Sequence, residues 1–238
     1  MGTLDGPGIR TVVFMQGCLL RCRYCHNPDT FKIFTGGEKI EGGMPEVYTA
    51  DELFNKVIRY REYYGKEGGV TASGGEPLLQ TEFLTAFFKK LKAAGINTAL
   101  DTAGSVWNDK VRELLSCTDL VILDIKHTDA AAYDELCGQK KGAGLYGKVL
   151  RFLDYCAGQK KRIWLRQVIV SGINDTMQQI TELKRLCDKY KPEKVELLPY
   201  HTMGAAKWAA LDLKYTLNGV EPPDGKKMES LKKILTFS

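Results

Sequence analysis

The chain of 238 residues is long enough for one α/β domain, because barrels of this class reach such lengths without dividing. Hydrophobic residues make up 44% and charged residues 26%, the ordinary balance of a soluble globular protein. A net charge of +5 from 34 basic and 29 acidic residues is mild and spread along the chain. It does not indicate the clustered basic surface of a nucleic-acid-binding protein. No apolar run is long enough to cross a membrane.

The seven cysteines do not form the even, regularly spaced set of a disulfide scaffold. Four of them, Cys117, Cys137, Cys156 and Cys187, are scattered without metal-ligand spacing and are interpreted as core or surface thiols of a reducing compartment. The N-terminus lacks a basic region followed by an apolar stretch. The expected location is therefore cytoplasmic.

Short β-branched and apolar runs predict six strands. The first, over residues 9–16, is expected to be buried and leads directly into a cysteine-rich loop. The six predicted strands span residues 9–16, 69–73, 97–101, 120–125, 163–170 and 195–199.

Helical periodicity predicts a helix after most of these strands. Thr49 and Glu52 form a capping box before the first of them, and Asn174 or Asp175 is the expected cap of a later one. Residues 32–48 read as a glycine-rich loop. The predicted helices span 51–64, 81–94, 108–116, 129–158 with glycine interruptions, a segment ending at 190, and 226–235.

Strands that alternate with helices predict a parallel sheet with right-handed crossovers. The expected fold is a single domain over residues 1–238, an α/β partial (βα)6 barrel that is open and TIM-barrel-like, with a doubly wound sheet as the alternative. In both layouts functional groups gather at the carboxyl ends of the strands. The polar groups at or near these ends are the cysteine loop, Gly74-Gly75-Glu76, Asp101-Thr102, Asp124-Lys126, Arg166 and Tyr200-His201.

The cysteine loop places Cys18, Cys22 and Cys25 at spacings of four and three residues. Three thiolates can hold a four-iron cluster and leave one iron with an open position, where chemistry can occur. A zinc knuckle is the first alternative, but it needs a fourth ligand, and His26 adjoins Cys25 too closely to serve. Ordinary buried cysteines are the second.

The loop spacing resembles that of the radical S-adenosylmethionine superfamily, and further stretches resemble one branch, the pyruvate formate-lyase activating enzymes. The resemblance covers nearly the whole chain. The stretches are Asp5-Gly-Pro-Gly-Ile-Arg10, Tyr24-Cys-His-Asn27, Thr71-Ala-Ser-Gly-Gly-Glu76, Leu123-Asp-Ile-Lys126 and Glu196-Leu-Leu-Pro-Tyr-His201 with Gly204 and Lys207-Trp208.

This resemblance implies one [4Fe–4S] cluster, held by Cys18, Cys22 and Cys25, and S-adenosyl-L-methionine as co-substrate. Reductive cleavage of the cofactor would yield a 5'-deoxyadenosyl radical, which takes a hydrogen from the Cα of one glycine of pyruvate formate-lyase. Flavodoxin or ferredoxin would supply the electron, and a monomer is expected. Relative to the family, the chain is expected to lack a strand segment and a loop before Gly2.

The resemblance also implies where the cofactor binds. Gly74, Gly75 and Glu76 would receive its amino group, although by themselves they read as a turn before Pro77. Asp124 and Lys126 would bind its methionine part and ribose, with a simple surface ion pair as the alternative.

Other positions carry two interpretations each. Asp101 and Thr102, with Asp124, would hold Na+ or K+, or Asp101 and Thr102 would cap the following turn. Arg166 would contact the cofactor, or pair with an acidic residue such as Glu196. The adenine would lie against His201, Tyr24 and His26, whereas an ordinary loop histidine is the alternative for His201.

Three functional alternatives remain at the level of the sequence. The chain could act on another glycyl radical enzyme, act on a small molecule, or be an iron-sulfur electron carrier or sensor with a saturated cluster. The loop at 32–48 and the basic residues are candidate docking surfaces, with a merely solvated basic face as the alternative. These basic residues are Lys140, Lys141, Lys160, Lys161 and Arg162.

Overall fold

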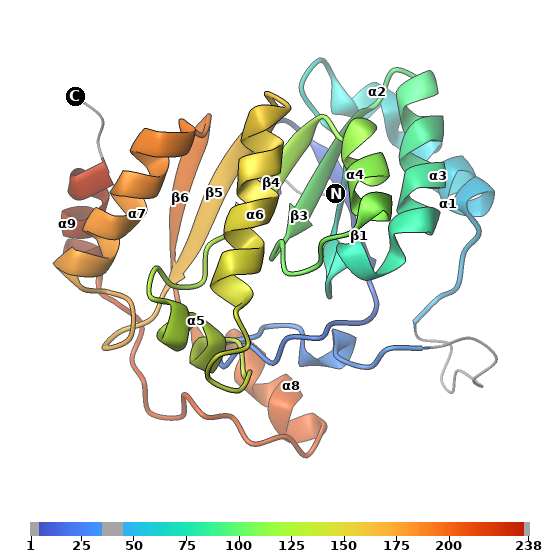
Figure 1. Ribbon diagram of the computed structural model, residues 1–238. Helices are drawn as coiled ribbons and strands as arrows, with labels where there is room; N and C mark the ends of the chain where they lie inside the picture. The colour runs from blue at the N-terminus through green and yellow to red at the C-terminus, as the bar shows by residue number, and fades with distance from the viewer. Residues whose placement is uncertain (1–4, 35–44, 236–238) are drawn as a thin grey trace. The chain divides into compact units, whose positions relative to one another are not determined.

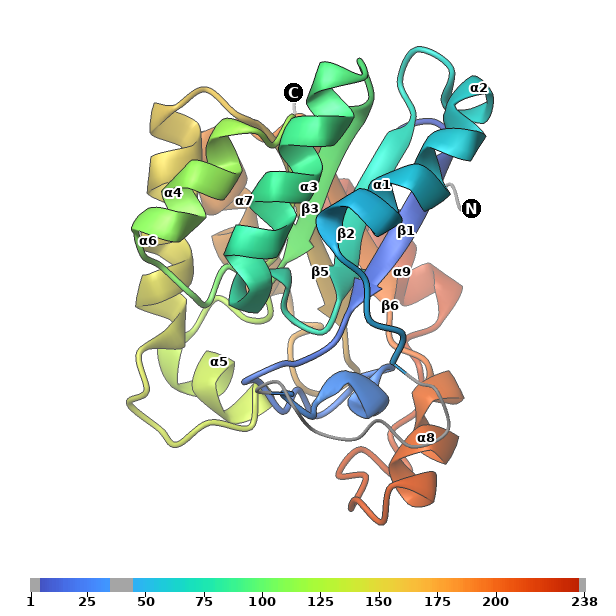
Figure 2. The same cartoon turned by 90° about the vertical axis from the view of Figure 1, so that its right-hand side faces the viewer.

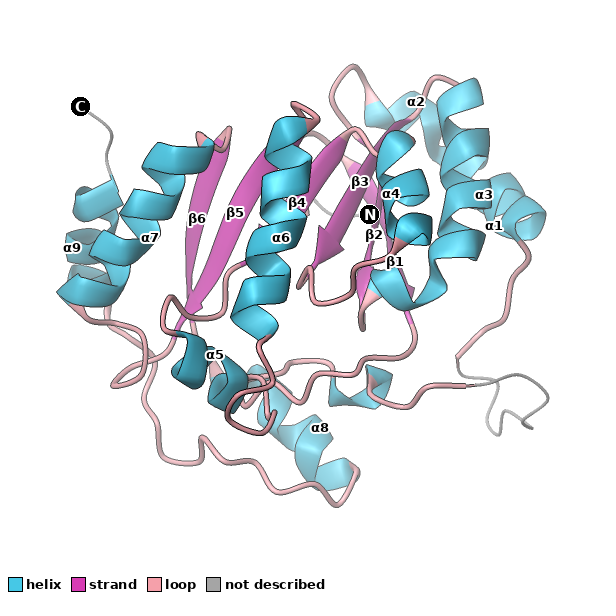
Figure 3. Ribbon diagram, in the orientation of Figure 1, coloured by secondary structure: helices cyan, strands magenta, loops and turns pink. Residues whose placement is uncertain are grey.

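The computed structural model describes residues 5–34 and 45–235, in which strands and helices alternate along the chain (Figures 1 and 3). The strands follow one another in the sheet in the order of the chain. They are β1 (Arg10–Met15), β2 (Gly69–Gly74), β3 (Asn97–Thr102), β4 (Leu120–Asp124), β5 (Arg162–Ile169) and β6 (Lys194–Pro199).

The helices connect these strands. The α-helices are α1 (Ala50–Val57), α2 (Arg61–Tyr64), α3 (Thr81–Ala93), α4 (Asp109–Ser116), α5 (Ala130–Leu136), α6 (Leu145–Gly158), α7 (Met177–Tyr190), α8 (Ala205–Ala210) and α9 (Gly225–Leu235). Short 3-10 turns are η1 (Pro28–Thr30), η3 (Ile58–Tyr60), η4 (Pro77–Gln80) and η5 (Thr202–Gly204).

This topology confirms the expected α/β fold of six parallel strands alternating with helices. A doubly wound sheet would reverse its strand order at a switch point, whereas the order here is β1 to β6 without a reversal. The carboxyl end of each strand is therefore followed by a loop that leads into helical structure, and these loops carry the candidate site.

The chain forms two compact units, which are described separately below. Unit 1 comprises residues 1–19, 30–102 and 106–122, and unit 2 comprises residues 20–29, 103–105 and 123–238. The single domain expected from the sequence stays a prediction.

In unit 1, β2 pairs in parallel with both β1 and β3, and its register places Arg10 beside Gly69 and Met15 beside Gly74. Helix α3 packs against both α1 and α4, as Figure 2 shows for α3 and α1. The prediction that the first strand is buried is confirmed only at its two ends, Arg10 and Met15. β1 lies at the edge of the sheet, and Phe14 is 60% exposed.

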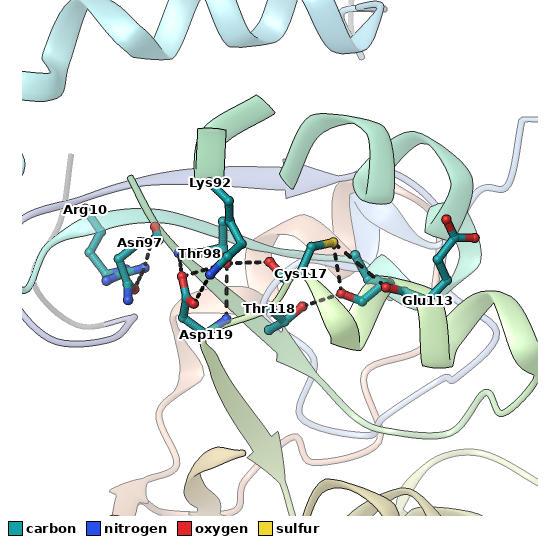
Figure 4. A network of polar contacts seen from close by, with 9 residues as sticks. Arg10, Lys92, Asn97, Thr98, Glu113, Cys117, Thr118 and Asp119 are labelled. Carbon is teal, nitrogen blue, oxygen red and sulfur yellow. Dashed lines mark hydrogen bonds and ion pairs between the residues drawn. The ribbon is translucent and has the colours of Figure 1, made fainter. Parts of the chain in front are cut away.

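Polar contacts fix the first residues of β3 (Figure 4). The buried Arg10 guanidinium donates to the Asn97 side chain at 2.9 Å, and the Thr98 backbone N–H donates to the Asp119 carboxylate at 3.0 Å. Burial raises the pKa of Asp119, but the nearby Lys92 ammonium and the Thr98 donors outweigh it and leave this pKa lowered. Asp119 thus remains ionised and joins β3 to the residue just before β4.

In unit 2, β5 pairs in parallel with β6, and α9 packs against α7 and β6, as Figure 1 shows. A hydrophobic cluster of buried residues includes Tyr24, Val170 and Tyr200 together with Leu136 and Leu217. Tyr24 and Tyr200 directly precede the predicted site residues Cys25 and His201 in the sequence. The core therefore fixes the backbone next to both of these residues.

Several local predictions are confirmed and others are corrected. The Thr49–Glu52 capping box is present at α1, but α7 is capped by Thr176 rather than by Asn174 or Asp175. Residues 129–158 hold two helices, α5 and α6, and the connection after β6 contains the unpredicted α8. The central part of the predicted loop at 32–48, residues 35–44, lies outside the described residues.

No helix within residues 5–34 and 45–235 is long and apolar enough to cross a membrane.

Candidate functional site

The glycine turn after β2 lies against the end of β1 in unit 1. The Gly75 N–H donates to the Met15 carbonyl and the Glu76 N–H to the Gly17 carbonyl, each at 2.8 Å. A Cβ atom on Gly75 would stand 2.3 Å from the Gly17 oxygen, which is closer than real Cβ contacts allow. Only glycine therefore fits at this position, which is held directly beside the residue that precedes Cys18.

The Glu76 carboxylate is 2% exposed at the residue level and lies at the start of η4. Its Oε1 accepts hydrogen bonds from the Leu78 N–H at 3.1 Å and from the Thr102 hydroxyl at 2.5 Å. Thr102 thus orients Glu76, a role that the sequence did not indicate. This fixed carboxylate is chemically suited to a ligand ammonium.

Asp101 and Thr102, the two predicted cation ligands of unit 1, form hydrogen bonds with other side chains of the protein. The Ser73 hydroxyl donates to Asp101 at 2.7 Å, and Thr102 donates to Glu76. Within the described part of the chain, no group of three or more His, Cys, Asp or Glu side chains is arranged to hold a metal ion. The monovalent cation therefore stays a prediction.

The cysteine loop runs from unit 1, which holds Cys18, into unit 2, which holds Cys22 and Cys25. All seven cysteines of the chain are free thiols. Cys22 is buried, whereas Cys18 and Cys25 are partly exposed. A four-iron cluster binds its three thiolates through different irons, so these ligands need not converge on one point as they would for a single ion.

Cys22 has a thiol neighbour that the sequence did not indicate. The Cys137 thiol donates a hydrogen bond to the Cys22 sulfur, and this hydrogen bond outweighs burial and lowers the pKa of Cys22. The same contact, together with burial, raises the pKa of Cys137. The interpretation of Cys137 as a core thiol is confirmed by its burial, but it also contacts the loop.

The segment after β6 holds the other end of the loop in unit 2. The Trp208 indole N–H donates to the Cys25 carbonyl at 2.8 Å, and His26 Nε2 donates to the His201 carbonyl at 3.1 Å. The His26 and His201 rings stack with centroids 3.9 Å apart. Lys207 adds an ion pair to Asp29 at 3.1 Å. These contacts hold residues 25–29 against residues 201–208, and we call this set of contacts the latch.

We expect Trp208→Phe to weaken this latch while keeping the aromatic packing. The variant leaves the Cys25 carbonyl without its indole donor, which costs about 1 kcal/mol and opens the loop roughly fivefold more often. Hydrogen exchange of the peptide containing residues 24–32 should accelerate accordingly. Trp107→Phe is the matched control, and equal exchange in both variants would contradict the latch.

Asp124 and Lys126 form an ion pair at the end of β4 in unit 2, with side chains 22% and 10% exposed. The ion pair considered as the alternative is therefore present, but it is largely buried rather than at the surface. Burial lowers the pKa of Lys126, but the charges of Asp124, Tyr24 and Cys22 outweigh it and leave this pKa well above its usual value. The ammonium lies 5.6 Å from the Tyr24 ring centroid.

Two further residues support the backbone beside this pair. The Tyr133 hydroxyl donates to the Asp124 carbonyl at 3.3 Å, and the Asn174 amide donates to the Lys126 carbonyl at 3.2 Å. Asn174 was predicted as a helix cap, and its sequence position alone gave no sign of this contact.

Arg166 of β5 pairs with Glu196 of β6, with Nε 3.1 Å from the carboxylate. The predicted ion pair is thus confirmed. It gives a carboxylate partner to the guanidinium of Arg166, a residue that is only 8% exposed. Among the candidate docking residues, Arg162 is engaged by Glu193 through two contacts of 2.7 and 2.8 Å.

Six buried polar side-chain atoms of unit 2 have no hydrogen-bond partner among the described residues, and three of them belong to predicted cofactor-binding residues: the Tyr24 hydroxyl, Asp124 Oδ1 and His201 Nδ1. The other three belong to Trp164 and Gln167 of β5. Because buried polar atoms in proteins are nearly always paired, such a group indicates a polar ligand or water that completes the site. The residues present therefore fit a polar cofactor.

Comparisons with known proteins agree with the family resemblance of the sequence motifs. Residues 12–187 match the Radical SAM superfamily. The chain is similar to the pyruvate formate-lyase-activating enzyme of Staphylococcus epidermidis, with 40% identity over 100% of this chain and 93% of the relative. It is 44% identical to the corresponding enzyme of Clostridium pasteurianum over 99% of this chain and 93% of that relative.

Solved structures support the fold. A domain of pyruvate-formate lyase-activating enzyme from Bacteroides vulgatus superposes with a TM-score of 0.57 and 25% identity, covering 71% of this chain and 92% of that domain. Streptococcus suis SuiB bound to its precursor peptide SuiA superposes with a TM-score of 0.69 and 16% identity, covering 95% of this chain and 45% of SuiB. At that identity the second likeness shows the fold alone, an open partial barrel.

Proposed function

The chain belongs to the radical SAM superfamily and to its pyruvate formate-lyase-activating enzymes, and on this premise we propose that it installs the glycyl radical of pyruvate formate-lyase. The observation that carries the proposal is the loop of only three cysteines in a chain similar to these enzymes over its whole length. Membership of the family implies a [4Fe–4S] cluster and S-adenosylmethionine. When bound, these two groups supply the 5'-deoxyadenosyl radical that removes a hydrogen from a glycine Cα.

We propose that Cys18, Cys22 and Cys25 hold the cluster. Six residues separate Cys18 from Cys25 in the sequence, so one short covalent stretch carries all three ligands. The hydrogen bond from Trp208 to Cys25 and the glycine turn beside Gly17 each restrain one end of this stretch. Such restraint favours cluster binding because less of the loop must be ordered when the ligands close on the irons.

The remaining roles follow from the chemistry of each side chain. Gly74 and Gly75 bring backbone close to the ligand, and Glu76 holds its ammonium, since Thr102 and Leu78 fix that carboxylate. Asp124 keeps one unpartnered oxygen for the ligand while its other oxygen pairs with Lys126. Lys126 remains protonated and can hold a negative or hydroxyl oxygen.

The adenine is assigned to the aromatic residues of unit 2. His201 and His26 present a stacked pair of rings, and His201 Nδ1 has no partner. Burial lowers the pKa of His26, so its ring is neutral and suited to stacking on a base. Tyr24 contributes its unpartnered hydroxyl, and Arg166 stays a proposed cofactor contact beside its pair with Glu196.

Finer features of the proposal rest on the family resemblance. These are flavodoxin or ferredoxin as reductant, a monomeric state, a cytoplasmic location and a Na+ or K+ ion held by Asp101, Thr102 and Asp124.

The test is an anaerobic activation assay. The reconstituted chain, a chemical reductant, S-adenosylmethionine and pyruvate formate-lyase are mixed, and a glycyl radical EPR signal is expected on the partner. Cys22→Ala should lose the cluster and the signal together. A preparation that cleaves the cofactor yet produces no signal would reject pyruvate formate-lyase as the target. A full, redox-active cluster in Cys22→Ala would reject the ligand assignment.

A further inference from the structure

A fourth cysteine lies beside the cysteine loop in unit 2. The Arg21 N–H donates to the Cys137 carbonyl at 2.9 Å, and the Arg23 N–H donates to the Leu136 carbonyl at 3.0 Å. These two bonds flank Cys22 and bring its backbone alongside that of Cys137. A Cβ atom on Gly138 would stand 2.7 Å from the Arg21 Cβ, so the two segments are in direct contact.

The thiols of Cys22 and Cys137 meet in this contact, where Cys137 donates a hydrogen bond to the Cys22 sulfur. Cys137 is the C-cap of α5 and is 0% exposed, whereas Cys22 is 9% exposed. A disulfide also requires the two side chains to turn toward each other, and the hydrogen bond between the two thiols indicates that they do.

We propose that Cys22 and Cys137 form a reversible disulfide when the loop holds no cluster. The oxidant is a peroxide. The Cys22 thiol is oxidised to a sulfenic acid while one hydrogen peroxide molecule is reduced to water. The Cys137 sulfur then attacks the Cys22 sulfur, and the sulfenic hydroxyl leaves as a second water molecule with the Cys137 proton. The sulfur–sulfur bond thus forms at the expense of one peroxide.

The disulfide protects Cys22 of the loop from irreversible oxidation. A sulfenic acid that meets no thiol is oxidised further to sulfinic acid, which a dithiol cannot reduce, whereas a disulfide returns to two thiols. The buried Cys137 acts on Cys22 before a second peroxide arrives. The consequence for cluster assembly rests on the proposed role of Cys22 as a ligand, but disulfide formation itself does not.

The experiment maps the disulfide in the full chain after anaerobic removal of iron. The protein is treated with an equimolar amount of hydrogen peroxide, its free thiols are blocked with N-ethylmaleimide, and it is digested with trypsin. Trypsin places each of the seven cysteines on a separate peptide. The expected product is the peptide of residues 127–140 joined to the dipeptide Cys22-Arg23, detected by mass spectrometry.

A recovery assay tests the protective effect. After an excess of hydrogen peroxide and then a dithiol, the wild-type chain should rebind at least about threefold more iron than Cys137→Ser treated in the same way. Cys156→Ser removes another buried thiol and should behave as the wild type. Untreated Cys137→Ser should bind iron normally, which shows that the variant folds.

Two results would overturn the proposal. One is a disulfide of Cys22 with Cys18 or Cys25 in place of Cys137, and the other is equal iron recovery in the wild-type chain and Cys137→Ser. Iron binding by untreated Cys22→Ala reports on the ligand assignment separately. The disulfide and the proposed function can therefore fail independently.

Discussion

Gly75→Ala is expected to destabilise the chain by about 3 kcal/mol and to prevent full cluster assembly. The new methyl group would stand 2.3 Å from the Gly17 carbonyl oxygen. Its nearest neighbours are all backbone atoms of Gly17 and Met15, which cannot rotate away. The turn must therefore move from β1 and break the bonds from Gly75 to Met15 and from Glu76 to Gly17. Urea unfolding and iron content after anaerobic reconstitution measure the two effects.

The matched control is Gly158→Ala at the end of α6. A Cβ atom there meets nothing within 4 Å, and the backbone is not in the left-handed region. Alanine also has the higher helix propensity, so stability should be equal or slightly greater. If Gly75→Ala and Gly158→Ala unfold at the same urea concentration, the steric account of the turn is wrong.

Asp124→Asn is expected to cost about 3 kcal/mol of stability and to weaken S-adenosylmethionine binding by at least about tenfold. The change leaves the Lys126 ammonium 10% exposed with no carboxylate beside it. A buried charge that loses its partner pays its desolvation cost without compensation. Thermal unfolding measures the first effect, and binding of the cofactor to the reconstituted protein measures the second.

Glu113→Gln provides the comparison. It breaks the ion pair with Lys89, whose two side chains are 57% and 58% exposed. Exposed pairs contribute little because water already solvates both charges, so the change should be within about 0.5 kcal/mol. An effect of Asp124→Asn no larger than that of Glu113→Gln would show that the Asp124–Lys126 pair is not buried in solution.

The residues that could be predicted from the sequence are those whose partners are close along the chain. The capping box needs only Thr49 and Glu52, three positions apart, and the structure shows both of its hydrogen bonds. The cysteine loop is likewise defined by local spacing, and this spacing is typical of the family. Strand and helix ranges follow periodicity, which is also local.

The contacts that could not be predicted join residues that are far apart. Thr102 donates to Glu76, Asn174 to the Lys126 carbonyl and Cys137 to Cys22, and no spacing rule connects these pairs. The partial exposure of the first strand could not be predicted either. An apolar run has the same appearance at the edge of a sheet as in its centre, and only the strand order shows that β1 is at the edge.

The latch on the cysteine loop has a consequence for biosynthesis. Trp208 follows Cys25 by 183 residues, so the three cysteines are synthesised long before the tryptophan that donates to the Cys25 carbonyl. At translation rates of about 5–20 residues per second, that interval lasts roughly ten to forty seconds. During this time the nascent chain exposes three thiols with no latch. A latched cluster therefore cannot form until translation has passed Trp208.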